Sequence, residues 1–160
     1  MSAHSLTEQL AEVLQQHGWM LATAESCTGG MIAANCTDLS GSSNWFERGF
    51  VTYSNAAKIE LLGVDAALID QHGAVSEPVA RAMAQGALEH SAAQVAVAVT
   101  GIAGPTGGNA GKPVGTVWLA WATSDGVDAA LQRFAGDRAA VRSATVVHAL
   151  QGLVQRLQRP

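Results

Sequence analysis

The 160-residue sequence contains only two cysteines, Cys27 and Cys36, and this number excludes a disulfide-stapled framework. It has no apolar run long enough to span a bilayer, and its first residues carry neither the basic start nor the apolar core of a secretion signal. Basic residues are also scarce, because nine Lys and Arg stand against 13 Asp and Glu, for a net charge of −4. This balance argues against a nucleic acid or a membrane as the partner. We therefore expect a cytoplasmic protein.

Apolar residues are abundant, at 48 % of the total, which is enough to bury the core of one domain spanning residues 1–160. The segment 94–100 includes a continuous apolar run, as is typical of a buried central strand. Two more strands are predicted at 114–123 and 127–134, joined by a hairpin turn at 124–126. Helical patterns alternate with these strands along the chain. The sequence thus predicts a three-layer α/β/α fold with a mixed, partly antiparallel sheet.

Helix starts are marked by capping residues. Ser5 and Glu8 have the spacing of a capping box for the first helix. Ser54 is a candidate N-cap for a short helix, and Asp137 is one for the last helix. The strand predicted at 45–53 carries two charged residues, so we expect it away from the centre of the sheet.

The segment Ala24-Glu25-Ser26-Cys27-Thr28-Gly29-Gly30 lies between a predicted strand and a predicted helix. Its glycines let the backbone approach a ligand closely, and the amides of 27–30 would be unpaired donors at the helix N-terminus. A hydroxyl beside such donors is the arrangement that acyl transfer needs, which makes Ser26 a candidate nucleophile. Two alternatives stay open. In the first, Ser26 is an ordinary helix N-cap with no catalytic role. In the second, the neighbouring Cys27 is the nucleophile, unless it is only a small buried residue.

A serine nucleophile needs a base, and histidine is the usual one. None of the five histidines has a spacing that supports a Ser-His-Asp arrangement. Lys58 is the other candidate, because lysine loses its proton when buried and arginine does not. Its pKa would have to fall from ~10.4 to roughly 7–8, which demands an apolar, water-poor site. Tyr53, five residues earlier, would relay a proton or orient the amine. The alternatives are a solvated Lys58 and a Tyr53 packed in the core.

A glycine-rich loop at 101–113 follows the predicted central strand, which is a good ligand position in an α/β sheet. It lacks the Gly-Lys-Ser/Thr tail of a Walker loop. Arg138 and Arg142 are four residues apart, so they share a helix face and would bind a phosphate between them unless they are ordinary surface arginines. No histidine or cysteine pair has the spacing of metal ligands, and no metal site is expected.

Four motifs in this order resemble the CinA C-terminal domain family: Ala24 to Gly30, Tyr53-Ser54-Asn55 to Lys58, Val99-Thr100-Gly101-Ile102-Ala103-Gly104-Pro105, and Gly136-Asp137-Arg138. The resemblance extends from about Leu6 to Leu157. It implies a hydrolase that acts on a linear carboxamide, with no metal and no cofactor. The substrate implied is nicotinamide mononucleotide, which would yield nicotinic acid mononucleotide and ammonia in pyridine nucleotide recycling.

Carried over by motif, the resemblance implies Ser26 as the nucleophile, Lys58 as its general base and Tyr53 as an assistant. Amides of the turn, and that of Gly101, would hold the oxyanion, while the loop and one of the two arginines would hold the phosphate. We also expect a homo-oligomer, most simply a dimer. The rival interpretation is a non-catalytic nucleotide-binding or regulatory module linked to competence or DNA damage. The predicted substrate-binding residues are Thr28, Gly29, Gly30, Thr100, Gly101, Gly104, Arg138 and Arg142.

Overall fold

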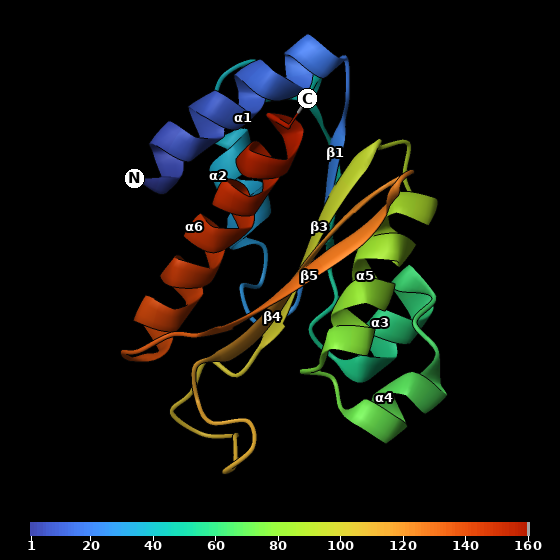
Figure 1. Cartoon of the computed structure of the whole chain (residues 1–160), viewed down its shortest axis with the longest axis vertical. Helices are drawn as coiled ribbons and strands as arrows, with labels where there is room; N and C mark the ends of the chain where they lie inside the picture. Colours follow the sequence, from blue (N-terminus) through green and yellow to red (C-terminus); the bar gives the residue numbers. More distant parts are fainter. Residues whose placement is uncertain (160) are drawn as a thin grey trace.

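The computed structural model describes residues 1–159, in which a five-stranded sheet lies between two layers of helices (Figure 1). The strand order is β2-β1-β3-β4-β5. The parallel strands are β1 (Leu21–Glu25), β2 (Phe46–Val51) and β3 (Val95–Gly101). The antiparallel part consists of β4 (Thr116–Thr123) and β5 (Gly126–Arg133). The predicted α/β/α fold with a mixed sheet is therefore confirmed, and β2 lies at the edge as expected.

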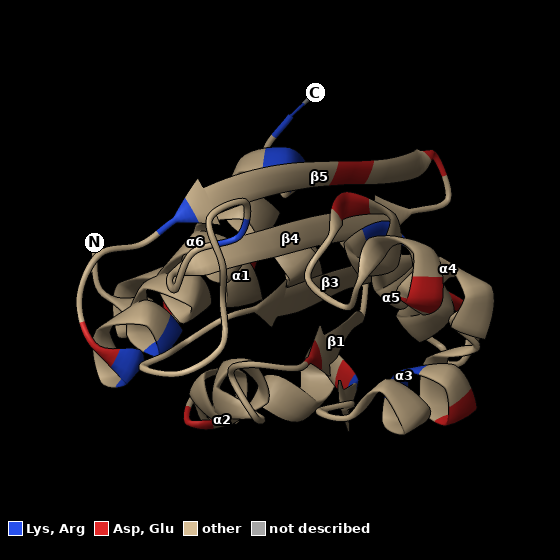
Figure 2. Cartoon of the chain, turned by 90° about the horizontal axis from the view of Figure 1, so that it is seen from below, with Lys and Arg blue, Asp and Glu red and all other residues tan. Residues whose placement is uncertain are grey.

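The helices divide evenly between the two faces of the sheet (Figure 1). One face is covered by α1 (Ala3–His17), α2 (Met31–Thr37) and α6 (Arg138–Leu157). The other is covered by α3 (Asn55–Leu62), α4 (Ala66–His72) and α5 (Glu77–Glu89), and a short 3-10 turn spans Ser42–Asn44. Within residues 1–159, no helix combines the length and hydropathy needed to cross a membrane. Figure 2 shows the few lysines and arginines spread over the ribbon and not gathered on one face.

The two faces of the sheet differ in side-chain size. The valines of β3, at positions 95, 97 and 99, pack into the core beneath α1 and α6. Its alanines, Ala96 and Ala98, pack beneath α5 together with small residues of β1 and β4. The helices on this alanine face also approach each other closely, because a Cβ added to Gly86 of α5 would lie 2.0 Å from the carbonyl oxygen of Leu62 in α3. This packing fixes α3 in place, and α3 carries Lys58.

The helix caps predicted from the sequence agree with the structure at α3 and α6 but not at α1, and Gly30, not Ser26, is the N-cap of α2. Ser2, not Ser5, caps α1, and its Oγ accepts a hydrogen bond from the Ser5 amide at 3.1 Å. The predicted capping box of Ser5 and Glu8 is therefore wrong, because the chain is already helical at Ser5 and extended at Ser2. The caps predicted at Ser54 and Asp137 are confirmed, since each side chain accepts from an amide in the first turn of its helix.

Candidate active site

The C-terminal ends of the parallel strands β1 and β3 lie side by side, and Figure 2 looks toward this end of the sheet. Ligands in open α/β sheets bind at this position. A cavity of about 230 Å³ opens there between the turn after β1, the start of α3 and the loop after β3. Its lining residues are Ser26, Cys27, Tyr53, Asn55, Lys58, Ala74, Val75, Thr100, Gly101, Ala103 and Arg138.

The Lys58 side chain reaches into this cavity from α3, and its Nζ lies 3.0 Å from Ser26 Oγ. Only 1 % of Lys58 is exposed, so the alternative of a solvated lysine is wrong. The amine also donates to the carbonyl oxygens of Thr52 and Tyr53, both at 3.0 Å. No carboxylate of residues 1–159 forms an ion pair with it. Burial without a counter-charge lowers the pKa of Lys58 below its ordinary value.

The partners of the Lys58 amine also determine its orientation when it is neutral. A neutral primary amine has two N–H bonds and one lone pair. The carbonyls of Thr52 and Tyr53 accept the two N–H bonds, so the lone pair faces the third neighbour, Ser26 Oγ. In this state the serine hydroxyl donates to the amine, which is the geometry of a nucleophile beside its base.

Other candidate nucleophiles and bases fit less well. Burial raises the pKa of the Cys27 thiol to about 11, so it stays protonated at neutral pH and is a poor nucleophile. No histidine lines the cavity. Two of the histidines contact backbone oxygens elsewhere, His17 that of Leu157 and His90 that of Gly86. The structure therefore gives no support to a Ser-His-Asp triad.

Tyr53 faces solvent, with 61 % of its surface exposed, so it is not packed in the core. Its phenolic oxygen accepts a hydrogen bond from Arg138 Nη2 at 3.3 Å. The contact of Tyr53 with Lys58 runs through its backbone carbonyl. The expectation that the Tyr53 hydroxyl orients the amine is thus wrong in this structure, because the hydroxyl contacts Arg138 and only the backbone carbonyl contacts Lys58.

The turn after β1 is organised by Glu25, a residue for which the sequence analysis predicted no role. Its buried carboxylate accepts from the Thr28 hydroxyl at 2.6 Å and from the amides of Ile32 and Ala33 at 2.8 and 3.0 Å. Glu25 therefore satisfies two amides in the first turn of α2. The amides of 27–30, which we expected to be unpaired donors, are not among its partners. The sequence signal that could have predicted this role is an acidic residue a few positions before the start of a helix.

Both glycines of the turn have positive φ, 59° at Gly29 and 107° at Gly30, which side chains disfavour. The Gly29 amide donates to the carbonyl oxygen of Ser26 at 3.1 Å, so it is not free to bind an oxyanion. The side chain of Thr28 is buried and directed to Glu25. Thr28 and Gly29 were predicted to bind substrate, but the Thr28 side chain and the Gly29 amide instead make hydrogen bonds within the turn and fix its backbone.

The two arginines of α6 make different contacts. Arg142 donates from Nε to the carbonyl of Cys27 at 3.0 Å and from Nη2 to that of Thr28 at 3.2 Å. Arg138 is exposed, lines the cavity and donates from Nη1 to the carbonyl of Gly104 at 2.8 Å. Arg142 therefore holds the turn after β1, whereas Arg138 lies at the edge of the cavity.

The end of β3 contributes Thr100 and Gly101 to the lining. Thr100 is buried, and its hydroxyl donates to the carbonyl of Ala74 at 3.0 Å, which ties β3 to the segment before α5. Gly101 has no room for a side chain, because a Cβ there would lie 2.6 Å from Val117 Cγ2 and 3.2 Å from Cys27 Sγ. The floor of the cavity is therefore backbone at this point.

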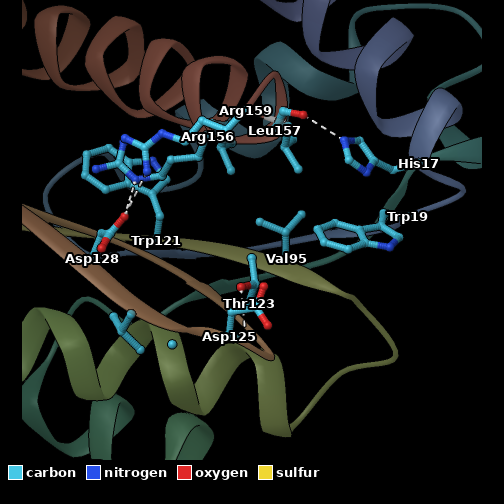
Figure 3. A pocket seen from close by; sticks show the side chains of 13 residues that line it. His17, Trp19, Val95, Trp121, Thr123, Asp125, Asp128, Arg156, Leu157 and Arg159 are labelled. Atoms are coloured by element: carbon cyan, nitrogen blue, oxygen red, sulfur yellow. Dashed lines mark hydrogen bonds and ion pairs between the residues drawn. The ribbon is translucent and has the colours of Figure 1, made fainter.

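A larger cavity of about 530 Å³ lies at the opposite end of the sheet, near the β4–β5 hairpin (Figure 3). Arg156 stacks over the ring of Trp121 at 3.8 Å and pairs with Asp128 at 3.2 Å. His17 and Trp19 form another side of the cavity. No nucleophile stands beside a base there, so size alone does not mark the site. Residues 1–159 hold no group of three His, Cys, Asp or Glu side chains suited to a metal ion.

Known proteins share this sequence and fold. The nicotinamide-nucleotide amidohydrolase PncC of Enterobacter agglomerans is 56 % identical over 149 residues, covering 92 % of this chain and 91 % of the relative. The protein of the same name from Escherichia coli strain K12 is 53 % identical over 152 residues, covering 94 % and 92 %. The crystal structure of the competence/damage inducible protein CihA from Agrobacterium tumefaciens superposes with a TM-score of 0.95 at 46 % identity, covering 98 % of this chain and 96 % of the other.

The sequence model of the CinA C-terminal domain matches residues 3–157, which is nearly the whole chain. This range includes every residue of the Ser26–Lys58 cavity and both helix layers that surround it. The chain therefore belongs to the CinA C-terminal domain family.

Proposed function

We propose that this protein hydrolyses the carboxamide of nicotinamide mononucleotide to nicotinic acid mononucleotide and ammonia. The observation that carries the proposal is the 3.0 Å contact between the buried Lys58 amine and Ser26 Oγ at the strand ends. The names of relatives that are 53–56 % identical over nearly their whole length support the choice of substrate. Purified protein should release one ammonia and one nicotinic acid mononucleotide per substrate consumed. Binding of the mononucleotide without ammonia release would favour the regulatory alternative.

In the proposed mechanism, neutral Lys58 takes the proton of Ser26 as Oγ attacks the carboxamide carbon. The lysinium then gives this proton to the departing nitrogen, and the C–N bond breaks to release ammonia. Water next attacks the acyl-enzyme, with Lys58 again accepting a proton and returning it to Ser26 Oγ. The carbonyls of Thr52 and Tyr53 hold the amine throughout.

The oxyanion formed during both attacks needs donors close to Ser26. Within residues 1–159, the backbone N–H groups of Cys27, Thr28 and Gly30 donate to no backbone oxygen, and those of Cys27 and Thr28 directly follow the nucleophile. We assign them this role in place of the Gly29 amide, which is already engaged. Loss of one such donor typically raises the barrier by ~3 kcal/mol.

For the substrate's phosphate we choose Arg138 over Arg142. Arg138 lines both the cavity at Ser26 and an open groove along the start of α6, so it stands where the nucleotide would pass from one to the other. The guanidinium of Arg142 is held by two carbonyls of the turn. An exposed guanidinium can bind phosphate through two parallel hydrogen bonds.

Substitution of Arg138 by glutamine is expected to raise KM for nicotinamide mononucleotide by about 10- to 100-fold, the worth of a charge-assisted hydrogen bond. KM for nicotinamide riboside, which has no phosphate, should stay within about threefold of the wild-type value, a much smaller change than the one expected for the mononucleotide. Steady-state kinetics with both substrates provide the test. Arg133→Gln is the matched control, because Arg133 is also exposed and also donates to a loop carbonyl, that of Gly111. An equal rise of KM for both substrates would mean that Arg138 acts by holding the loop.

The lowered pKa of Lys58 predicts how the activity depends on pH. Protonated Lys58 has no lone pair and cannot act as the base, so kcat/KM should be low at acidic pH and rise by about tenfold per pH unit. It should level off above the pKa of Lys58, which lies below the ordinary value of 10.5. A profile of kcat/KM between pH 5 and about 9.5 gives the midpoint. A decline of activity over the same rise in pH would contradict a lysine base.

A further inference from the structure

Glu25 is a buried titratable group that the proposed chemistry does not use. It precedes Ser26 directly, only 1 % of it is exposed, and no lysine or arginine in the described part of the chain forms an ion pair with it. All three of its hydrogen-bond donors come from residues that follow Ser26, namely the Thr28 hydroxyl and two amides of α2. A carboxylate with this set of partners ties the end of β1 to the start of α2 across the nucleophile.

The same turn is held from its other side by Arg142, which binds the carbonyls of Cys27 and Thr28. In a trans peptide the C=O and N–H bonds point in opposite directions. Because the Cys27 carbonyl faces Arg142, the N–H of Thr28 points away from α6. Because the Ser26 carbonyl faces the Gly29 amide, the N–H of Cys27 points away from Gly29. The surrounding contacts thus set the directions of the Cys27 and Thr28 amides.

Glu25 also settles what the start of α2 binds. Without it, the amides of Ile32 and Ala33, in the first turn of α2, would be unpaired donors inside the protein, and the start of α2 would lose its tie to the end of β1. With it, an internal carboxylate fills this position at hydrogen-bond distances of 2.6–3.0 Å. The turn amides that have no backbone acceptor then include the two that directly follow Ser26.

We propose that Glu25 is a positioning residue for the hydrolysis, which holds the 26–30 turn so that the Cys27 and Thr28 amides meet the oxyanion. This inference rests on the proposed function. Glu25 touches neither substrate nor Lys58 and acts only through the turn. Its loss should therefore slow the chemical step and spare the binding of substrate, because the phosphate is held elsewhere.

The test compares Glu25→Gln with the wild-type chain. Glutamine keeps the size of the side chain but turns an NH₂ group toward donors. We expect kcat to fall by about 100-fold, as for a misplaced oxyanion donor, with KM within about threefold and an unchanged pH midpoint. Glu77→Gln is the matched control, because Glu77 lies in the first turn of α5, and it should behave as wild type. Thr28→Val, which removes only the 2.6 Å hydroxyl bond, should lower kcat by about tenfold.

A kcat of Glu25→Gln close to the wild-type value would overturn the proposal. A pH profile of Glu25→Gln with a shifted midpoint but an unchanged plateau would also overturn it, because Glu25 would then act on the charge of Lys58. If Glu25→Gln does not fold, a wild-type kcat in Thr28→Val overturns it. The rate at which a fluorophosphonate labels Ser26 provides a readout without substrate. If the wild type is labelled but does not deamidate the mononucleotide, the proposed function fails, and slower labelling of Glu25→Gln still supports the positioning role. Equal labelling of both chains, or none of the wild type, overturns it.

Discussion

Substitution of Lys58 by arginine is expected to lower kcat for ammonia release by about a thousandfold or more. Arginine keeps the positive charge but cannot give up its proton, so it cannot act as the base for Ser26. General base catalysis typically contributes 10²- to 10⁴-fold, and the same group also protonates the leaving nitrogen, which places the loss at the upper end of this range. The measurement is single-turnover ammonia release, together with the dissociation constant of the mononucleotide.

The control for this variant is Lys112→Arg, which changes the only other lysine of the chain. Lys112 donates to the carbonyl oxygen of His72 at 2.8 Å, and arginine can replace this contact. We expect unchanged kinetics. Because the guanidinium is larger than the buried ammonium group that it replaces, Lys58→Met serves as a second variant of similar volume, with the same expected loss. Activity of Lys58→Arg or Lys58→Met within about tenfold of wild type would remove Lys58 from its role as base.

Substitution of Ser26 by alanine is expected to lower turnover by on the order of 10⁴-fold or more, since no covalent intermediate can form. The fold should persist, because the hydroxyl contacts only the Lys58 amine and, at 3.4 Å, the Tyr53 carbonyl. Binding of the mononucleotide should survive for the same reason. The measurements are ammonia release, thermal unfolding and ligand binding.

Ser143→Ala, at an exposed position on α6, is the matched control and should keep full activity. A mass increase on Ser26 when the wild type is quenched during turnover would identify the acyl-enzyme directly. Turnover by Ser26→Ala at a rate near wild type would instead point to Cys27 or to an activated water, and the serine mechanism would be wrong.

Much of the fold follows from signals local in the sequence. The apolar run of β3, the Asp125-Gly126 hairpin and the caps at Ser54 and Asp137 each depend on neighbouring residues, and each is confirmed. The cap of α1 was misplaced because Ser2 and Ser5 have similar propensities, and only the backbone conformation distinguishes them. Local signals therefore predicted the elements well and their ends less well.

The site was less accessible to sequence reasoning. Ser26 and Lys58 are 32 residues apart, and their contact depends on the parallel pairing of β1 with β2, which no local pattern reveals. Their pairing was expected from the family resemblance. The roles of Glu25 and Arg142 were missed because their partners are mostly backbone atoms, which leave no trace in residue types. The exposure of the Tyr53 ring likewise depends on tertiary surroundings that no local pattern reveals.

The main-chain oxygens that hold the Lys58 amine have a consequence for how this site tolerates change. Every amino acid supplies the same carbonyl, so side-chain drift at positions 52 and 53 leaves the surroundings of the amine intact as long as the backbone path is kept. Both oxygens also belong to the segment that leads directly into α3. The stretch from 52 to 58 thus contains both the lysine and the two main-chain groups that orient its amine.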